Sequence, residues 1–482
     1  MLEPRPRPAT QTPPDLRMSD LRSWLADLAA HGRLAVAREN LPLADNLAAV
    51  AKRTERDKAV LFPHPVGADG KAHDMPVVVN LFTQRAWVAD ALGVTEDQLL
   101  PHFLAAAAKP TPCVEVTSAP VQEVVHNEVN LLAQLPIPSH NELDSGPYIT
   151  AGLLIARNPV TGVQNVSIHR CQISGPNRIG VLLLPRHTLA YYRMAEEAGA
   201  ALEIAIVIGA HPALLLASQA ICALDEDEME IAGSLLGRPV EVVKCRTNAV
   251  RVPAAAEIVV EGRILPKVRE PEGPFGEFPQ YYGPRAAREV IEVDAVTHRR
   301  HPIYHTIVGG SFEHLVLGGV PREATLLQHL KRSFPNVLDV RLTRGGTCRY
   351  HLVVKIDKER EGEAKNIILC AFGGHYDVKQ VVVVDKDVDI SSADEIEWAV
   401  ATRFQADRDM VVVSGALGSK LDPSTDEGGI GAKLGLDATA PLSDDPLAFR
   451  RIRVKGEESV DLSDALVKDP NAAFARIVAQ VS

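Results

Sequence analysis

The chain is organised around one stretch, Arg269-Glu270-Pro271-Glu272-Gly273-Pro274-Phe275-Gly276-Glu277, which is followed directly by Phe278-Pro279-Gln280-Tyr281-Tyr282. Because proline fixes φ and glycine frees it, this stretch is predicted to form a bend and not a regular helix or strand. A rigid bend with a carboxylate at each end, Glu272 and Glu277, can hold the two at a set separation. Burial could then keep one neutral while a cation keeps the other charged, as acid–base chemistry requires. A surface turn with hydrated acids is the simpler interpretation of the same residues.

Length and charge limit the classes of protein to consider. At 482 residues the chain exceeds the size at which a single core keeps growing, so we expect two or three domains. The net charge of -11 argues against nucleic acid or an anionic membrane as the main partner, but it leaves room for a local basic pocket that binds a phosphate. No apolar run is long enough to span a bilayer.

The cysteines and the first residues indicate a cytoplasmic protein. The six cysteines are scattered and form no CxxC pair, which is typical of a reducing compartment and not of a disulfide framework or a zinc site. Residues 1–17 hold five prolines and three arginines without an apolar core. We therefore expect a disordered leader there, and neither a signal peptide nor an anchor.

Three regions of different texture follow the leader. Residues 18–125 read as an α/β domain, with a helix at 20–30, a buried strand at 76–82 and helices within 84–109. Residues 126–317 are dominated by short β-branched runs between Gly, Pro and Asn, which predicts a barrel or a sandwich. Residues 318–482 return to an α/β pattern and end in a tail, beginning at Ser414, that is rich in Gly, Ser, Asp and Pro. The predicted elements of the last two regions are strands at 148–156, 165–173, 180–184, 201–208, 239–245, 258–264, 290–297, 302–308, 350–356 and 379–384, and helices at 324–334 and 393–405.

The strand Gln164-Asn165-Val166-Ser167-Ile168-His169-Arg170 is the first further candidate for a site. Side chains alternate along a strand, so Asn165, Ser167 and His169 share one face and Arg170 points the other way. The planar guanidinium of Arg170 suits a substrate carboxylate, which it can bind through two parallel hydrogen bonds. A surface ion pair at a strand end is the alternative.

Two more places add possible ligands for a cation. Arg186 and His187 end an apolar strand, and Asp225-Glu226-Asp227-Glu228-Met229-Glu230 forms an acidic block. An Asn oxygen, a His nitrogen and a Glu carboxylate together suit Mn²⁺ or Mg²⁺ beside a phosphate better than they suit zinc. A hydrogen-bonded structural histidine and a solvated helix start are the alternatives.

Together, in this order, these four places resemble the UbiD family of prenylated-flavin-dependent decarboxylases. The resemblance covers residues 18 to 440 and is most specific at Asn165–Arg170, at Glu228–Gly233 with Gly237–Cys245, and at Glu272–Glu277. It implies an α+β protein with an N-terminal α/β region, a central split β-barrel like that of flavin reductases, and a C-terminal α/β domain that mediates oligomerisation. On this basis we prefer the site interpretation of the bend.

The resemblance also implies cofactors and the residues that hold them. Asn165, His187 and Glu228 match the ligands of a divalent metal, typically manganese, that grips the phosphate of prenylated FMN, and a potassium ion is often bound nearby. Family members vary at the position of His187 between His and Arg. The positions that match cofactor contacts are Asn165, Val166, Ser167, Ile168, His169, Arg170, Arg186, His187, Glu228 and Lys379, of which Lys379 lies in the least distinctive sequence.

For catalysis, Arg170, Glu272 and Glu277 match the Arg–carboxylate–carboxylate network of the family. By this analogy Arg170 orients the substrate carboxylate, Glu272 holds Arg170 in place, and Glu277 delivers the proton that replaces CO₂. The pKa of Glu277 is then expected to lie near the working pH, raised by burial.

The family's substrates are aromatic, heteroaromatic and α,β-unsaturated acids. Gly309–Glu323 looks similar to members that act on furan-, pyrrole- or hydroxybenzoate-type acids, and indole-type acids belong to the same group. We therefore expect reversible decarboxylation of an aromatic or heteroaromatic acid, with a cinnamate-type acid as the alternative. His314 or Arg322 could face a ring substituent or a second carboxylate, although a structural role suits either residue equally.

The expected partners are a small carboxylic acid, CO₂, and a separate flavin prenyltransferase that supplies the cofactor. Family habit predicts a homodimer or a homohexamer. A flavin-binding oxidoreductase is a competing interpretation, but no GxGxxG follows a predicted strand. A non-catalytic subunit of a decarboxylase complex is another, which the presence of all three matching catalytic positions disfavours.

Overall fold

The computed structural model describes residues 19–481 apart from 45, 68, 69, 444, 446 and 458, so the predicted leader at 1–17 lies outside the described residues. The chain divides into two compact units, and the boundary along the sequence falls between Thr439 and Ala440. The second unit contains α12 (Leu462–Ala465) and α13 (Pro470–Val481). Among the described residues, no helix is both long and apolar enough to cross a membrane.

The first unit begins with an α/β region, as predicted. Its elements are α1 (Leu21–Ala30), β1 (Leu34–Val36), α2 (Asn46–Thr54), β2 (Ala59–Phe62), β3 (Val77–Val79), α3 (Arg85–Ala91), η1 (Glu96–Gln98) and α4 (Leu99–Ala108). The strands form a sheet in the order β1-β2-β3-β18, completed by β18 (Tyr304–His305). The strand predicted at 76–82 is shorter than expected, because the chain turns at Asn80, whose φ is positive.

Helix α1 forms where the pattern predicts it. Leu21, Trp24, Leu25 and Leu28 recur at helical spacing and are all buried. The carboxylate of Asp20 caps the helix by accepting a hydrogen bond from Ser23 N at 2.9 Å. The apolar spacing and the cap therefore fix both the buried face and the first residue of this helix.

A nine-stranded antiparallel sheet dominates the middle of the chain. Its order is β6-β9-β10-β17-β14-β11-β7-β8, with β5 paired to β17. The elements of this region are β4 (Val114–Glu115), η2 (Pro120–Gln122), β5 (Val124–His126), α5 (Leu131–Gln134), β6 (Tyr148–Ile149), β7 (Leu153–Arg157), β8 (Gln164–Ile168), β9 (Cys171–Gly175), β10 (Arg178–Val181), α6 (His187–Glu197), β11 (Leu202–Ile208), α7 (Pro212–Ala217), α8 (Glu228–Leu236), β12 (Glu241–Lys244), β13 (Arg251–Pro253), β14 (Ile258–Glu272), β15 (Phe275–Gly276), β16 (Tyr282–Gly283) and β17 (Ala286–His298).

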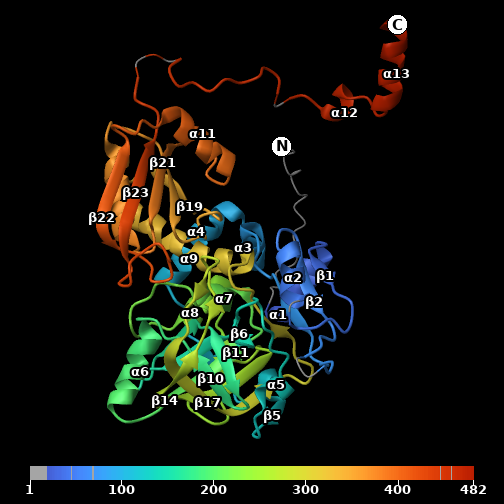
Figure 1. Ribbon diagram of the computed structural model, residues 1–482, viewed down its shortest axis with the longest axis vertical. Coiled ribbons are helices and arrows are strands. Elements are labelled where there is room, and N and C mark those ends of the chain that lie inside the picture. Colours follow the sequence, from blue (N-terminus) through green and yellow to red (C-terminus); the bar gives the residue numbers. More distant parts are fainter. Residues whose placement is uncertain are drawn as a thin grey trace. The chain divides into compact units, whose positions relative to one another are not determined.

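This sheet is strongly curled (Figure 1). Strand β8 forms one end of the strand order and β9 lies next to the other end, yet only residues 169 and 170 join them. Because two residues span only about 7 Å when fully extended, the two ends of the sheet must come close together. The resulting fold is a mixed α+β protein in which Arg170 lies where the curled sheet meets itself.

Both faces of the curled sheet are buried. Along β11, Ile204, Ile206 and Ile208 belong to one apolar core, whereas Ala205 and Val207 belong to another. Such alternation places successive side chains on opposite faces, so a strand that is covered on both sides reads as a continuous apolar run. This explains why residues 201–208 were predictable as a buried strand.

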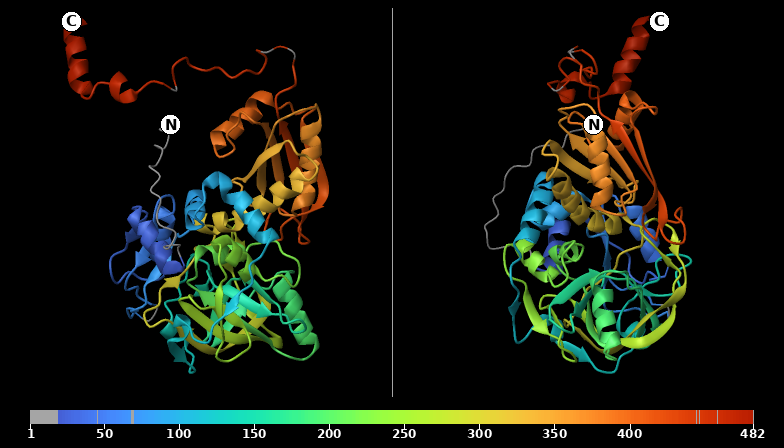
Figure 2. Two further views of the ribbon diagram at one scale, coloured as in Figure 1. Left: turned by 180° about the vertical axis from the view of Figure 1, so that it is seen from behind. Right: turned by 90° about the vertical axis from the view of Figure 1, so that its left-hand side faces the viewer.

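The C-terminal part of the first unit is a five-stranded mixed sheet in the order β19-β20-β21-β23-β22. Its elements are α9 (Phe312–Lys331), β19 (Val337–Leu342), β20 (His351–Ile356), α10 (Glu363–Gly374), β21 (Gln380–Asp385), α11 (Ala393–Arg403), β22 (Met410–Leu417) and β23 (Ile430–Ala438). Helix α9 packs against α4, α7, α10 and β19, and Figures 1 and 2 show it between this sheet and the curled one.

Two predictions for this region are wrong. The helix expected at 324–334 begins at Phe312, because Ser311 caps it by accepting from His314 N and the helix continues through Gly318 and Pro321. Gly318 does not interrupt the helix: a Cβ there would lie 1.8 Å from Arg349 Nη2, so its role is close packing. The second error is the tail expected from Ser414, since β23 is a strand inside the sheet between β21 and β22.

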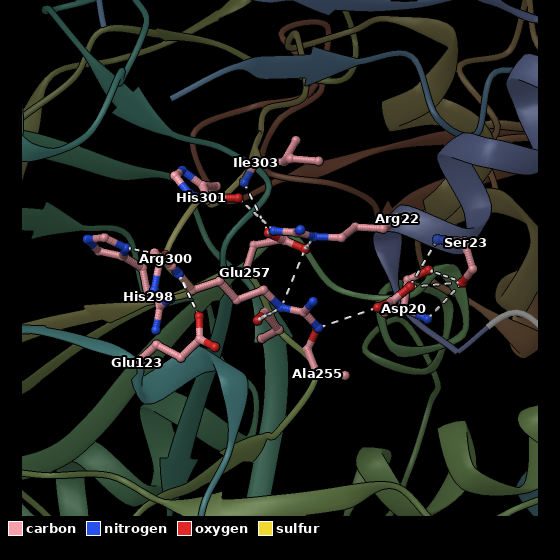
Figure 3. A network of polar contacts seen from close by, with 12 residues as sticks. Asp20, Arg22, Ser23, Glu123, Ala255, Glu257, His298, Arg300, His301 and Ile303 are labelled. Carbon is pink, nitrogen blue, oxygen red and sulfur yellow. Dashed lines mark hydrogen bonds and ion pairs between the residues drawn. The ribbon is translucent and has the colours of Figure 1, made fainter. Parts of the chain in front are cut away.

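An ion network around the buried carboxylate of Glu257 ties α1 to the start of β14, although the Arg22 side chain is 41% exposed. Arg22 donates to both oxygens of Glu257 at 2.8 Å, and Arg299 Nε lies 3.6 Å from the same carboxylate. Asp20 Oδ2 lies 3.4 Å from Arg299 Nη2, which balances the second guanidinium. Figure 3 shows Arg22 reaching from the helix to Glu257. Loss of either arginine would leave the buried Glu257 carboxylate with less compensating charge, so the network holds the N-terminal helix on the sheet.

Candidate active site

Arg170 lies between two carboxylates that are far from it in the sequence. Its Nη2 donates to Glu272 Oε2 at 2.7 Å, and its Nη1 donates to Glu277 Oε1. The side chains of Arg170 and Glu272 are 7% and 0% exposed, and that of Glu277 is 11% exposed. The two carboxylates of the bend are therefore buried and are not hydrated surface acids, and the structure brings them together at Arg170.

The end of β14 carries Glu272. The prediction that the stretch from Arg269 to Glu277 contains no regular strand is wrong, because β14 runs through Pro271 to Glu272. The pairing of β14 with β11 ends at Ile264, so residues 269–272 pair, among the described strands, with β17 alone. Proline is tolerated on such an open edge because its missing N–H costs no ladder hydrogen bond.

The hairpin of β15 and β16 carries Glu277. Glu277 N donates to Tyr281 O at 2.9 Å, which closes the turn, and Gly276 N donates to Asp144 Oδ1 at 2.8 Å. A Cβ at Gly283 would lie 2.8 Å from Arg170 Nη1, so only glycine lets the backbone approach the guanidinium here. The hairpin thus holds the second carboxylate against Arg170.

Two carboxylates share one guanidinium in this buried group. Burial raises the pKa of Glu277 above its usual value, although Arg170 opposes the rise. Burial alone would lower the pKa of Arg170, but Glu277 and Glu272 raise it, so Arg170 stays charged. An excess of buried acid over base favours uptake of a proton, and Glu277 is the carboxylate that burial prepares to hold it.

A second polar group surrounds β8. The single strand predicted at 165–173 is wrong, because β8 ends at Ile168 and the chain turns at residues 169 and 170 into β9, so only Asn165 and Ser167 alternate within a strand. Ser167 Oγ lies 2.9 Å from His169 Nε2 and 3.0 Å from Thr188 Oγ1, and Thr188 donates to Asn165 Oδ1 at 2.9 Å. The side chains of Asn165, Ser167 and His169 therefore form one polar group, whereas Arg170 points to Glu272 and Glu277. Val166 and Ile168 alternate between them on β8.

Glu228 joins this polar group from the first turn of α8. Its Oε1 accepts from Asn165 Nδ2 at 2.7 Å and its Oε2 accepts from Val166 N at 2.6 Å. Burial raises the pKa of Glu228 to about 8. Within the described part of the chain, no lysine, arginine or histidine forms an ion pair with it. A cation bound beside Asn165 would supply the missing positive charge, so the Asn165–Glu228 pair fits a hard divalent ion.

The third predicted metal ligand, His187, is the first residue of α6 and is half-buried. It follows the exposed Arg186 and precedes Thr188, which bonds to Asn165, so it lies next to the polar group in the chain. Burial and the charge of Arg186 lower the pKa of His187. Among described residues, no three His, Cys, Asp or Glu side chains gather closely enough to hold a metal.

Lys379, the remaining predicted cofactor contact, lies directly before β21. Its Nζ donates to Asp422 Oδ2 at 2.7 Å and to Ser424 Oγ at 2.6 Å, and not to the group around β8. The cavity beside it, lined by Tyr350 and Asp377 among others, measures about 20 Å³, which is room for about one water molecule.

A third group, rich in cations, includes Arg349 and His314 beside the ring of Phe278, the residue that follows Glu277 in the chain. The ring of Phe278 has Arg349 Cζ 5.2 Å from its centre and the His314 ring 6.3 Å away. Burial, together with the charge of Arg349, lowers the pKa of Arg322 to about 9. Among described residues neither guanidinium forms an ion pair with a carboxylate, and Arg322 Nε has no hydrogen-bond partner. The charge of Asp377 acts on both arginines and opposes the effect of burial on their pKa, so one carboxylate serves two buried guanidinium groups. Such an excess of positive charge suits an anion.

Two further residues of the site carry no sequence motif. Thr188 links Ser167 to Asn165, and Tyr148 bonds to Glu272. The only signal for Thr188 is its position after Arg186 and His187, and Tyr148 lies in a short strand far from the bend. Neither was predicted from the sequence.

Comparisons with known proteins match nearly the whole first unit. The matching domain descriptions are the 3-octaprenyl-4-hydroxybenzoate carboxy-lyase N-terminal domain at residues 25–107, the Rift-related domain of the same name at 113–312, and its C-terminal domain at 315–438. The polar groups described above all lie within the matched residues.

Among curated proteins, the chain is 41% identical over 373 residues to an anhydromevalonate phosphate decarboxylase of Methanothermobacter thermautotrophicus, which covers 77% of this chain and 87% of that protein. Among solved structures, it resembles the UbiD-class enzyme HmfF of Pelotomaculum thermopropionicum in complex with FMN, with 50% identity, a TM-score of 0.90, and coverage of 93% and 100%. An evolved dimeric form of that enzyme, with prFMN, gives 48% identity, a TM-score of 0.86, and the same coverage.

A more distant structure widens the range of substrates among the relatives. The apo 3,4-dihydroxybenzoic acid decarboxylase of Enterobacter cloacae is 28% identical with a TM-score of 0.86, and the match covers 93% of this chain and 99% of that chain. The relatives thus include decarboxylases named for a phosphorylated acid and for an aromatic acid.

Proposed function

The chain belongs to the UbiD family of carboxy-lyases, and from this premise we propose that it removes CO₂ reversibly from an aromatic or heteroaromatic acid with the help of prenylated FMN. The observation that carries the proposal is the buried group of Arg170, Glu272 and Glu277. In this group the guanidinium of Arg170 can bind a carboxylate through two hydrogen bonds, and Glu277 is an acid whose pKa is raised by burial.

The residues around β8 are proposed to hold the cofactor. The polar group of Asn165, Ser167 and His169 would bind the flavin. Structures of two relatives of this protein contain FMN and prFMN. Asn165 and Glu228 would hold Mn²⁺ or Mg²⁺ against its phosphate, because Glu228 is a buried acid that has no cationic partner among described residues. His187 and Lys379 complete the proposed contacts, with K⁺ as a further ion.

The type of barrel and the oligomeric state are further parts of the proposal. The curled sheet is proposed to be a split barrel of the flavin-reductase type. The C-terminal sheet is proposed to join copies of the chain as a homodimer or homohexamer, and a dimeric form of a relative supports that habit.

The protein's own groups then divide the chemistry. Prenylated FMN, when bound, supplies an electron sink for the bond that breaks. Arg170 binds the substrate carboxylate, and Glu272 keeps the guanidinium in place. As the carbon–carboxylate bond breaks, its electron pair stays with the carbon, and CO₂ leaves. Protonated Glu277 gives its proton to that carbon and is recharged from solvent. The buried position of the group excludes water that would otherwise compete for Arg170.

The buried arginines Arg349 and Arg322 near Phe278 favour a substrate with a second negative charge. Arg349 and Arg322 offer guanidinium donors to a carboxylate on the far side of a furan- or pyrrole-type ring. The same cations favour a second candidate, decarboxylation of an acid that carries a phosphate, because the 41% identical relative is named for such a substrate. Arg349→Gln should raise the KM of the doubly charged substrate and leave that of a monoacid unchanged.

The test uses the full chain produced together with a flavin prenyltransferase. Loaded protein is incubated with furan, pyrrole, hydroxybenzoate, indole and cinnamate acids, their dicarboxylic forms, and a phosphorylated unsaturated acid, and CO₂ release is measured. We expect CO₂ from a ring acid, fastest with a second carboxylate. Release from the phosphorylated acid alone would favour the second candidate. No release from any acid by spectroscopically loaded protein, or oxidation of a reduced nicotinamide instead, would overturn the proposal.

A further inference from the structure

Tyr148 presents its hydroxyl to the one oxygen of Glu272 that Arg170 leaves free. Tyr148 Oη lies 3.1 Å from Glu272 Oε1, whereas Arg170 Nη2 donates to Oε2. Both Tyr148 and Glu272 are fully buried. Each carboxylate oxygen therefore has its own donor, and the plane of the carboxylate is fixed from both sides.

The neighbouring amide leaves the hydroxyl only one useful orientation. Tyr148 and Gln172 are paired across β6 and β9, and Gln172 Oε1 also lies 3.1 Å from the hydroxyl. That amide is oriented by two other bonds, since its Nε2 donates to Ser145 O at 2.8 Å and its Oε1 accepts from Gly273 N at 3.0 Å. The hydroxyl thus faces two acceptors with one hydrogen, and the buried carboxylate is the stronger acceptor.

The aromatic ring of Tyr148 is fixed as firmly as its hydroxyl. Its centre lies 4.5 Å from the centre of the Phe275 ring, and Arg170 Cζ lies 5.5 Å from the same Phe275 centre. Burial raises the pKa of Tyr148, and the charge of Glu272 acts in the same direction, so the hydroxyl remains a donor across the working range of pH. The tyrosine has the rigidity and the proton that a positioning group needs.

We propose that Tyr148 is a positioning residue that holds Glu272, and through it Arg170, in the geometry that binds the substrate carboxylate. This inference rests on the proposed function. Without the hydroxyl, Oε1 of Glu272 is left bare in the interior, and the carboxylate turns to share both oxygens with Arg170. The guanidinium then moves away from Glu277 and from the place of the substrate.

The kcat of Tyr148→Phe and the pH dependence of its activity distinguish a positioning role of Tyr148 from a packing role. Because misplacement by about 1 Å costs about 100-fold in rate, Tyr148→Phe should lower kcat by about 10- to 100-fold. Glu277 faces Arg170 and Glu272 directly, and Asp144 lies against its hairpin. When Arg170 withdraws, burial raises the pKa of Glu277 further, so the loss of activity at alkaline pH should move to higher pH.

The chain offers a matched control. Tyr304 is also fully buried, and its hydroxyl has no hydrogen-bond partner among described residues. Tyr304→Phe therefore removes the same atom without a positioning role. We expect it to keep the wild-type kcat, KM and pH profile.

A binding measurement keeps the inference separate from the proposed function. Benzoate, as a simple carboxylate probe, is titrated into cofactor-free wild type, Tyr148→Phe and Tyr304→Phe, each checked for its thermal transition. We expect about tenfold weaker binding in Tyr148→Phe alone. If wild type releases no CO₂ but benzoate binding falls as expected, the proposed function fails and the positioning role stands. Equal benzoate binding and an unchanged pH profile in folded Tyr148→Phe would overturn the inference. Should that variant not fold, Tyr148→3-fluorotyrosine, with a more acidic hydroxyl, must change benzoate binding, and an unchanged affinity would overturn it.

Discussion

Two arginine–carboxylate networks in this protein, each built around a fully buried carboxylate, differ in their balance of charge. Around Arg170, one guanidinium serves two carboxylates, Glu272 and Glu277. Around Glu257, two guanidinia face that carboxylate, and Asp20 balances the second one. Both networks are built from the same groups at similar distances. Only the first has a carboxylate in excess, and there burial raises the pKa of Glu277.

The comparison shows how the same ion pair can serve structure or chemistry. A balanced network resists change, because moving a proton or removing a partner leaves a buried charge alone. In a buried network with two carboxylates and one guanidinium, one carboxylate can be protonated and can act as a proton donor. We therefore expect substitutions in the first network to change turnover, and substitutions in the second to change stability.

The largest expected effect is on turnover. Glu277→Gln keeps the shape and the hydrogen bond to Arg170 but removes the proton donor. We expect turnover to fall by about 10²- to 10⁴-fold, the usual contribution of a general acid, while the flavin spectrum stays unchanged. The measurement is CO₂ release by loaded protein.

The matched variant for this prediction is Glu257→Gln, which changes the same chemical group in the balanced network. It should retain wild-type turnover at temperatures at which it is folded. Retained activity in Glu277→Gln would remove that residue as the acid.

Glu228 gives the next effect, on binding of metal and flavin. Glu228→Ala should lose metal and cofactor together, because the proposed cation loses its only buried carboxylate contact. Metal content and the flavin spectrum of purified protein are the measurements. A fully loaded variant would show that Glu226 or Glu230 is the ligand instead.

Stability should respond most to the balanced network. Glu257→Gln removes the buried carboxylate that Arg22 and Arg299 share. Because the Arg22 side chain is 41% exposed, the cost in the free energy of unfolding should lie between about 1 kcal/mol, as for an exposed pair, and about 3 kcal/mol, as for a buried one. Urea denaturation measures the change. A loss below about 0.5 kcal/mol would mean that the network does not hold α1 on the sheet.

The excess carboxylate should also be visible in the pH dependence of stability. The pKa of Glu277 is raised in the folded protein, so the folded state holds this proton more tightly than the unfolded chain. Stability from this group is therefore present at low pH and is lost as pH rises above the usual pKa of 4.5. Each tenfold difference in proton affinity between the folded and unfolded states corresponds to about 1.4 kcal/mol. Glu277→Gln should gain stability over wild type between pH 4 and 8 in urea titrations, and parallel curves would contradict the raised pKa.

The smallest effect on stability and turnover is expected at Glu270, a partly exposed residue of β14, the strand that also carries Glu272. Arg178 and Glu270 form a 2.7 Å ion pair, but both side chains are 34% exposed. Such a pair contributes about 0–1 kcal/mol, so Glu270→Gln should change neither stability nor turnover by more than that. A larger loss of stability or turnover in Glu270→Gln would show that any carboxylate at this end of β14 matters, and that the burial of Glu272 is not the reason for its importance.

Local patterns in the sequence were sufficient where the physics is local. The spacing of Leu21, Trp24 and Leu28 predicts α1, and the alternation of Asn165 and Ser167 predicts the polar face of β8, which ends one residue before His169. Family resemblance was needed to bring Arg170, Glu272 and Glu277 together, because no local pattern links residues about a hundred positions apart.

The remaining features depend on tertiary context. Strand β14 passes through Pro271 because a single neighbour, β17, pairs there, and α9 passes through Gly318 because Arg349 occupies the space of a side chain. Tyr148 acts on the site only because β6 and β9 are paired. None of these partners can be identified from the residues that need them.

The most direct test of the central claim is exchange of hydrogen in the product. Loaded protein is incubated with the decarboxylated product in D₂O without CO₂, and deuterium at the reacting carbon is followed by NMR. If Glu277 carries the proton, wild type and Glu257→Gln should exchange at the same rate, and Glu277→Gln should not exchange. Exchange by Glu277→Gln at the wild-type rate would contradict the account.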